Sequence, residues 1–395
     1  MNLSKNEDLA YAMTPLKILA WPVGTWPLQK HSVSSVLRSV ISICLLLVMM
    51  TIIQTEIYLD HRHAEKNLDG LMMVGCSIMA ISKVMWFRLR SEGLTANFSS
   101  ALKDYDELDG EEKRAIMRRH AYMGRVACAS VIGFSYFGST LYVSVSMLGE
   151  DEEAANEDVN VTLEEPVDYP FPSQCTMEML QVPKSLNPVI FIFEYVMLLI
   201  TSTGNLGSDS LFFGIMFHLC GQAEVLKLEL TKLVKENQDT ANRFNSLIAR
   251  HHHLLTMSDY LNDTISSILV VQLFTSCILI CTTGFAFILS LNVDIVLTIK
   301  TLLSASTLLS QLYAYSYVGD YLKTQMEDIG FSIYSSSWYD LPSRLSRDVV
   351  FVVMRAQEPT CLRAGNFFVV NMESYMSIVK TSMSYLSVLR VMLAP

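Results

Sequence analysis

Seven long apolar runs constrain this chain more than any other feature of its sequence. A helix needs about 20 mostly apolar residues to cross the hydrocarbon core of a bilayer, and each run has about that length. Only 17% of the residues are charged, whereas soluble domains carry about 25%. The sequence therefore predicts an all-α membrane protein with seven transmembrane helices. The predicted spans are residues 36–58, 68–87, 126–148, 188–219, 265–291, 294–318 and 365–393.

The connections between these spans differ in positive charge. Segments 1–35, 88–125, 220–264 and 319–364, which share one side of the membrane, hold 21 Lys and Arg residues, and the connections on the other side hold 3. Cytoplasmic connections are the ones enriched in Lys and Arg. We therefore expect a cytoplasmic N-terminus and an extracellular C-terminus. A G-protein-coupled receptor has the opposite orientation, which argues against that class.

The predicted extracellular segment 149–187 is strongly acidic, with ten Asp and Glu residues and Lys184 as its one cation. Such a loop either concentrates cations at an outer mouth, an effect that salt screens within about 10 Å, or is simply solvated. The loop also contains Asn160 in an Asn-Val-Thr sequon, where we expect glycosylation.

Several classes of function find no support in the sequence. The net charge is −10 and no dense basic run is present, so we expect no nucleic-acid partner. The chain contains no nucleophile elbow or phosphate loop, so we expect neither enzymatic activity nor a cofactor. His251, His252 and His253 are adjacent on a helix and point in different directions, so we expect no metal site.

Two segments predicted to be cytoplasmic have amphipathic patterns too short to span a bilayer. In 221–264 leucines recur at helical spacing between lysines and glutamates, and 342–358 has a similar stripe. Helices of this kind need a surface to pack against, so we expect the two to pack together under the membrane as a subunit interface. The stripe in 342–358 consists of Leu345, Val349, Val352, Val353 and Ala356.

The last apolar run differs from the others because six hydroxyl groups interrupt it. A helix that faces only lipid has no use for so many hydroxyls, so one face meets either water or other helices. A pore-lining helix and a helix buried in a bundle both fit this composition. The residues are Ser374, Ser377, Thr381, Ser382, Ser384 and Ser387.

The C-terminal part of the chain resembles the signature of the insect odorant receptors. The number of spans and the cytoplasmic N-terminus extend this resemblance to the whole chain. The residues that carry it are Gln311-Leu312-Tyr313-Ala314-Tyr315, Gly319-Asp320, Ser335 to Pro342, Met354 to Pro359 and Lys380 to Arg390.

The resemblance implies a subunit of a tetrameric, odorant-gated channel that passes monovalent and divalent cations. In that family a variable tuning subunit assembles with a shared co-receptor, Orco, which has a much longer segment between spans four and five. Here that segment is only 220–264, so the chain resembles a tuning subunit in the plasma membrane of a sensory-neuron dendrite. A homomeric gustatory-type receptor is the alternative within the same architecture.

The family's seventh helix is split into a cytoplasmic anchor helix and a pore-lining helix, and these match 319–364 and 365–395 here. The resemblance also implies a hydrophobic gate near the outer end of the pore helix. Val388 matches the gate and Leu389 lies beside it, while Ser384 and Val391 are the other expected pore residues. Arg390 departs from the family pattern, because a cation beside a cation pore is unexpected.

The family binds odorants in the outer half of each subunit, among spans two, three, four and six. Apolar, aromatic and Met side chains suit a small volatile odorant, although plain helix packing is the alternative for each. Glu194 and Lys300 also lie in this half, where an ionisable group indicates a function or a buried partner, including a pair between the two. The expected ligand residues are Met72, Met73, Cys76, Tyr136, Phe137, Thr140, Leu141, Phe191, Tyr195, Ile299 and Leu303.

Overall fold

The computed structural model describes residues 3–29, 32–60, 64–156, 169–233, 240–291, 295–358, 360–365 and 368–393. Within these residues six helices are long and apolar enough to cross a membrane. A further helix, α11 (Met372–Leu393), has 22 residues and is more polar because of its hydroxyl groups. The six are α2 (Val33–Leu59), α3 (Ala64–Leu89), α5 (Glu111–Asn156), α7 (Asn187–Thr231), α8 (Thr240–Ser290) and α9 (Ile295–Tyr334).

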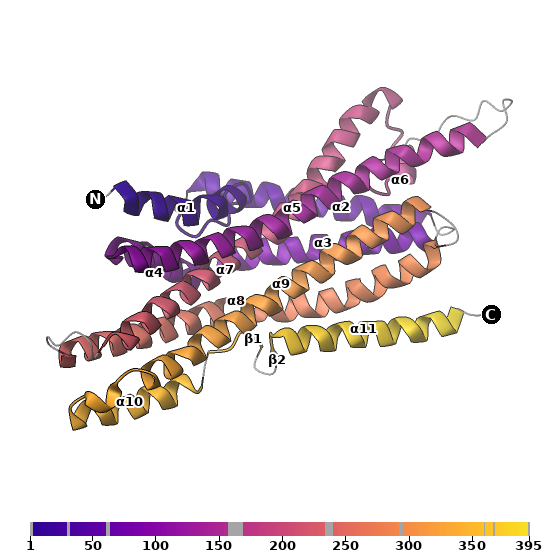
Figure 1. The fold of residues 1–395 in the computed structure, drawn as a ribbon. Helices are drawn as coiled ribbons and strands as arrows, with labels where there is room; N and C mark the ends of the chain where they lie inside the picture. The colour runs from indigo at the N-terminus through magenta and orange to yellow at the C-terminus, as the bar shows by residue number, and fades with distance from the viewer. Residues whose placement is uncertain are drawn as a thin grey trace.

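The long helices run roughly along one axis, and the shorter elements lie mostly near the two ends of the bundle (Figure 1). The N-terminus and α10 lie at one end, which we call the α10 end, and α6 and the C-terminus lie at the other, the α6 end. The shorter elements are α1 (Leu3–Ala20), α4 (Ser91–Glu107), α6 (Gln174–Met179), η1 (Lys184–Leu186), η2 (Trp338–Asp340), α10 (Ser343–Ala356), β1 (Arg363–Ala364) and β2 (Phe368–Val369).

Each predicted span coincides with a different helix, so the predicted all-α membrane architecture is confirmed. The helices are longer than the spans, because backbone hydrogen bonding does not stop where the bilayer does. The separate amphipathic helix expected in 221–264 is wrong: Leu226 and Leu230 belong to α7, and α8 already begins at Thr240. Helices α1 and α4 occupy segments for which the sequence predicted no helix.

The helix of the seventh span begins at Met372 rather than at Gly365. Strands β1 and β2 form an antiparallel hairpin between α10 and α11, and Gly365 lies in its turn with a φ of 65° that favours glycine. Asn371 then starts α11: its Oδ1 accepts from the Ser374 N–H at 2.8 Å, and Ser374 Oγ accepts from the Asn371 N–H at 2.9 Å. This reciprocal cap resembles a capping box.

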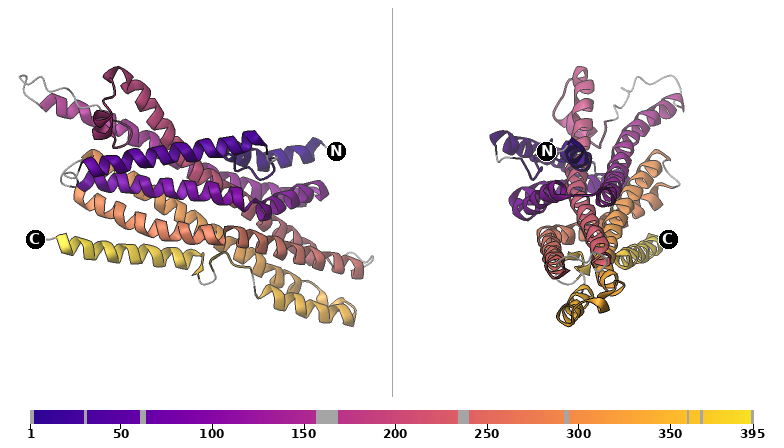
Figure 2. Two further views of the ribbon diagram at one scale, coloured as in Figure 1. Left: turned by 180° about the vertical axis from the view of Figure 1, so that it is seen from behind. Right: turned by 60° about the vertical axis from the view of Figure 1, so that its left-hand side comes forward.

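Helix α7 is the central helix of the bundle. It contacts α1, α2, α3, α5, α8 and α9, and Figure 2 shows it running through the middle of the other helices. Phe212, Phe213 and Phe217 of α7 are almost fully buried. Gly204 allows α3 to approach, because a Cβ there would lie 3.1 Å from the Cβ of Ala80.

Helices α10 and α11 pack on the outside of this bundle. The predicted apolar stripe of α10 is confirmed, since Leu345, Val349, Val352 and Ala356 are buried, chiefly against α9 rather than against the 221–264 segment. Helix α11 lies along α8 and α9 at one edge (Figure 2, left).

All four tryptophans of the chain lie at the α10 end. Trp21 and Trp26 follow α1, and Trp338 begins η2. Trp86 lies in the last turns of α3 and donates its indole N–H to the Thr264 carbonyl oxygen at 2.7 Å.

Candidate functional site

A second apolar core lies toward the α6 end, separate from the main one. It draws on α2, α3, α5, α7, α8, α9 and the segment before α6, and it is rich in Met and aromatic side chains. We call it the α6-end cluster. Its buried members are Met49, Ile53, Met72, Met73, Val74, Tyr142, Val143, Phe171, Met197, Leu198, Leu279 and Leu308.

The structure brings five of the eleven expected ligand residues to this cluster. Met72 and Met73 are members of it, and Cys76, Phe191 and Tyr195 pack against it. Tyr195 also shares a hydrogen bond of 3.0 Å with Thr140, which ties α7 to α5.

The other expected ligand residues lie further out. The Tyr136 hydroxyl bonds to Thr203 at 2.7 Å, and that side chain packs against the main core. Phe137 is 62% exposed and Ile299 is 38% exposed, and neither belongs to the cluster. Leu141 and Leu303 are half-buried.

The expected set left out several residues that the structure places in the cluster. Met49 and Ile53 belong to α2, which the resemblance did not include. Met197 was omitted although it lies one helical turn from Glu194, and that spacing was a usable signal. Phe171 lies in a loop with no periodic pattern, so the sequence offered no signal for it.

The segment before α6 covers this end of the cluster. Phe171 is 2% exposed and inserts among the cluster residues. The Glu56 carboxylate of α2 accepts hydrogen bonds from the backbone N–H groups of Cys175 (3.0 Å) and Thr176 (2.8 Å). A carboxylate at a helix N-terminus satisfies N–H groups that have no partner within the helix, so Glu56 fixes α6 over the cluster.

The expected pair between Glu194 and Lys300 is not formed. Glu194 instead accepts a hydrogen bond from Ser173 Oγ at 2.7 Å. The Lys300 ammonium lies 4.7 Å from the ring centroid of Tyr142, whose hydroxyl donates to Asp69. The sequence placed the two charges in spans four and six. Their partners differ because Glu194 meets the segment before α6 and Lys300 meets Tyr142 of α5.

About four helical turns beyond Glu194 on α7, Asp209 organises a buried polar network. Its carboxylate accepts from Lys83 Nζ of α3 and from Gln311 Nε2 of α9, both at 2.6 Å, and from the Tyr315 hydroxyl. Gln272 of α8 donates to Gln311 Oε1 at 3.3 Å. Lys83 is fully buried and Asp209 is 1% exposed, so the network joins four helices inside the bundle.

Helix α11 divides its hydroxyl groups between two faces. Ser374 and Ser382 are buried against the bundle, and Ser382 lies beside Cys277 and Cys281 of α8. The remaining hydroxyls are exposed, as are the expected pore residues Ser384 and Val388. The side chains of Leu389 and Val391 lie outside the described residues. The exposed hydroxyls are Ser377, Thr381, Ser384 and Ser387.

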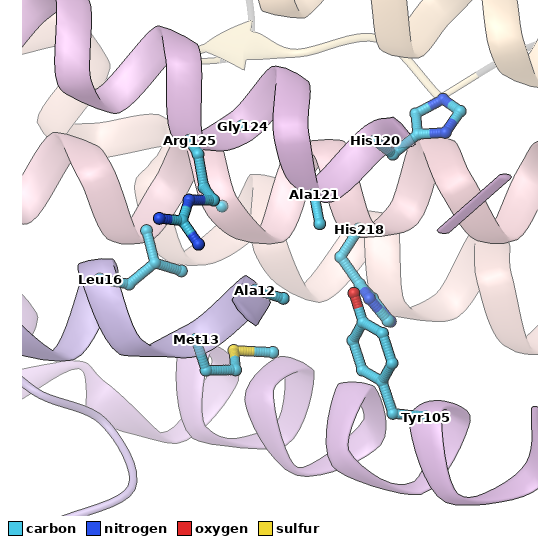
Figure 3. A pocket seen from close by; sticks show the side chains of 10 residues that line it. Ala12, Met13, Leu16, Tyr105, His120, Ala121, Gly124, Arg125 and His218 are labelled. Carbon is cyan, nitrogen blue, oxygen red and sulfur yellow. The ribbon is translucent and has the colours of Figure 1, made fainter. Parts of the chain in front are cut away.

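Two small hollows lie toward the α10 end, away from every expected ligand residue. The first lies among α1, α4, α5 and α7, and Figure 3 shows Tyr105 and His218 close together in its wall. His218 also lines the second hollow, between α4, α7 and α8, and bonds to Asp104 at 2.8 Å. Burial raises the pKa of Tyr105, so its phenol stays a neutral hydrogen-bonding group there.

Comparison with known proteins points to one family. A profile described as 7tm Odorant receptor matches residues 64–383. The chain is 26% identical to Odorant receptor 47a of Drosophila melanogaster over 214 residues, which is 51% of this chain and 54% of that protein. It is also 26% identical to Odorant receptor 9a of the same organism over 232 residues, or 58% and 57% of the two chains. The chain thus spans about half the length of the curated relatives it matches.

The fold is similar to that of a solved structure. The insect olfactory receptor OR5 from Machilis hrabei superimposes with a TM-score of 0.77 over 96% of this chain and 98% of that one. The structure of the same receptor in complex with eugenol gives a TM-score of 0.76 over 96% and 97% of the two chains. Sequence identity is 15% in both cases, so this likeness concerns the fold.

Proposed function

The chain belongs to the 7tm odorant receptor family, and from this we propose that it is the odorant-binding tuning subunit of a ligand-gated cation channel. It is a multi-pass membrane receptor of the insect type rather than an enzyme. The finer proposal concerns where it binds odorant, how it opens, and with what it assembles.

The α6-end cluster is the observation that carries the ligand-binding proposal. Its Met and aromatic side chains present apolar, deformable surfaces with few polar atoms, as a site for a small volatile molecule requires. Side chains of six helices meet in this cluster. Close van der Waals packing holds them together, because lipid tails are as apolar as these side chains and exclusion of water contributes little within a bilayer. An odorant that entered among Met72, Phe191 and Tyr195 would change the packing of α3 against α7.

The exposed face of α11 supports the conduction proposal. Hydroxyl groups at Ser377, Thr381, Ser384 and Ser387 would be costly against lipid and suit a water-filled path. The gate is proposed at Val388, with Leu389 and Val391 near it, where a ring of apolar side chains from several subunits would exclude water. Arg390 is exposed at the same end.

The α10 region supports assembly into a tetramer with co-receptor subunits. While one side of α10 packs on α9, Phe351 (68% exposed), Met354 (58%) and Val350 (53%) remain uncovered in a single chain. An apolar patch of this kind marks a protein-interaction surface. We assign 319–364 to the cytoplasmic anchor and 365–395 to the pore segment, with 1–35 cytoplasmic and 36–318 forming spans one to six.

Transmission between the two sites follows the helix contacts. Helix α9 contributes Leu308 to the α6-end cluster, packs against α10, and contacts α11. An odorant that prefers one arrangement of α9 would shift a pre-existing equilibrium between closed and open states. The same contacts therefore link odorant binding to the pore.

The decisive experiment records odorant-evoked current in cells that express this chain with and without the co-receptor. Rapid cation current only with both chains supports the tuning-subunit proposal, and Phe191→Ala should then change the rank order of odorants. Current from this chain alone would favour the homomeric gustatory-type alternative. A response that requires G-protein signalling and no current would contradict the channel proposal.

A further inference from the structure

Three buried carboxyl groups surround the α6-end cluster, one each on α2, α3 and α7. Glu56 is 7% exposed, Asp69 is 5% exposed and Glu194 is fully buried. Asp69 lies one turn before Met72 and Met73 of the cluster, and Glu194 lies one turn before Met197 and Leu198. Helical geometry therefore places both groups at the rim of the cluster nearest the α6 end.

In two of these groups, hydrogen bonds or a nearby cation stabilise the negative charge of the carboxylate. Both oxygens of Glu56 accept hydrogen bonds, from the N–H of Cys175 and from the N–H and hydroxyl of Thr176. Asp69 Oδ2 accepts from the Tyr142 hydroxyl. Its Oδ1 is buried and receives no hydrogen bond from the described residues, but the Lys300 ammonium supplies positive charge beside the group. Glu56 thus has two bonded oxygens, and Asp69 has a nearby cation.

Glu194 has neither two bonded oxygens nor a cation beside it among the residues that the structure describes. Its Oε1 accepts from Ser173 Oγ at 2.7 Å, and the backbone N–H of Phe171 points toward the carboxyl group. Its Oε2 is buried and receives no hydrogen bond from any residue that the structure describes. No Lys, Arg or His in the described part of the chain forms an ion pair with Glu194.

A buried acceptor that receives no hydrogen bond has lost its hydrogen bonds to water without replacement, which is unfavourable. A ligand with a suitable donor supplies the missing hydrogen bond. Glu194 lies one helical turn from Phe191 and from Met197 on α7, and the Phe171 backbone approaches its carboxyl group. These three residues belong to the cluster or pack against it, and their side chains would bind the apolar body of an odorant. The site thus combines an apolar surface with one acceptor at its rim.

We propose that Glu194 Oε2 accepts a hydrogen bond from the bound odorant, so the receptor selects volatile molecules that carry an O–H or N–H group. Alcohols, phenols and amines then bind in preference to ethers of the same shape, which leave Oε2 unsatisfied. This inference rests on the proposed odorant site at the α6-end cluster and adds the chemical class of its ligand.

The test uses pairs of isomers of which only one carries a donor: 1-octanol with heptyl methyl ether, 4-methylphenol with anisole, and further alcohol–ether pairs. Half-maximal concentrations for current are measured with the co-receptor, and thermal stabilisation of the purified receptor by the same probes reports binding without opening. The wild-type receptor should prefer the donor of a pair about tenfold. Glu194→Met should bring the ratio close to one in both measurements.

Two further variants separate the acceptor role from a structural one. Glu194→Gln keeps an acceptor oxygen of the same reach and should retain a preference for donors. Glu92→Gln changes an exposed carboxyl group of α4, outside the cluster, and it should leave the ratio at the wild-type value. Ethers that match their alcohols in the wild type, or a preference that survives in Glu194→Met, would overturn the inference and leave odorant reception standing. A receptor that no probe stabilises or opens would contradict the proposed function as well.

Discussion

Asp209 and Lys83 bring opposite charges together inside helices that cross the membrane. Their 2.6 Å contact is fully removed from solvent, and Gln311 and Tyr315 supply further donors to the carboxylate. Two buried charges are tolerated when they pair with each other and hydrogen bonds satisfy their remaining donors and acceptors. A single buried charge without a partner is strongly destabilising. The network therefore fixes the relative positions of α3, α7 and α9.

Removing either charge alone should destabilise the protein strongly. We expect Lys83→Met and Asp209→Asn each to lower the free energy of unfolding by about 3 kcal/mol, because each leaves the other group without its partner. The double variant should lose less than the sum of the two, with a coupling energy of about 1–3 kcal/mol. These values come from unfolding of four purified proteins in detergent: the wild type, the two single variants and the double variant, which together form a double-mutant cycle.

A surface ion pair is the control for this cycle. Lys323 and Glu327 lie 3.6 Å apart on α9 and are 42% and 45% exposed. Lys323→Met should change the free energy of unfolding by less than about 0.5 kcal/mol. Strictly additive losses at Lys83 and Asp209 would show that the buried pair does not act as a unit.

Among the elements, the junction between α9 and the start of α11 is a close contact between the bundle and the proposed pore helix. A Cβ at Gly319 would lie 2.3 Å from the Val370 carbonyl oxygen. One residue further along α9, the Asp320 carboxylate accepts from the Met372 N–H at 3.0 Å, where negative charge is favoured at the start of a helix. Movement of α9 therefore reaches α11 at its first turn.

Gly319→Ala should disturb this junction. The added methyl meets a backbone atom, which cannot turn aside as a side chain does, so the hairpin and α11 must move or the protein loses about 1–3 kcal/mol of stability. We expect a changed half-maximal odorant concentration or spontaneous current in cells with normal surface expression. Gly133→Ala, where a Cβ meets nothing within 4 Å, should leave the current unchanged, and equal behaviour of the two variants would contradict the role of the junction.

The elements show what the sequence could and could not predict. Apolar runs and the α10 stripe were predictable because their periodicity is local. The start of α11 was placed seven residues too early, since an apolar run does not distinguish a hairpin from a helix. The partners of Glu194 and Lys83 were not predictable, because Lys83 and Asp209 lie 126 positions apart and meet only through the packing of α3 on α7.

On the scale of the whole molecule, the uncovered face of α10 predicts that a single chain is an incomplete unit. Phe351→Ala should weaken assembly with the co-receptor by about 2 kcal/mol, as expected for a buried aromatic residue at an interface, and leave the fold of the chain intact. Light scattering and cross-linking of the co-expressed chains measure this. Phe137→Ala removes an equally large side chain of similar exposure, 62% against 68%, and should leave assembly unchanged.

The orientation of the whole chain has a direct chemical test. Asn160 lies outside the described residues, in the connection between α5 and the segment before α6, and the charge asymmetry puts this connection outside the cell. A glycosidase-sensitive mass that disappears in Asn160→Gln is therefore expected. A glycan on Asn2 instead would mean that the orientation is reversed.

Because the tryptophans lie at the α10 end, their intrinsic fluorescence reports on the conformation of that end of the receptor. No indole ring lies in the α6-end cluster, so an odorant bound there cannot quench tryptophan emission by contact. Any change in the wavelength or lifetime of that emission on adding ligand must instead be carried along the bundle to Trp21, Trp26, Trp86 or Trp338. A change in the tryptophan fluorescence of the unlabelled protein therefore reports a conformational change at the α10 end, and not contact between the odorant and an indole ring.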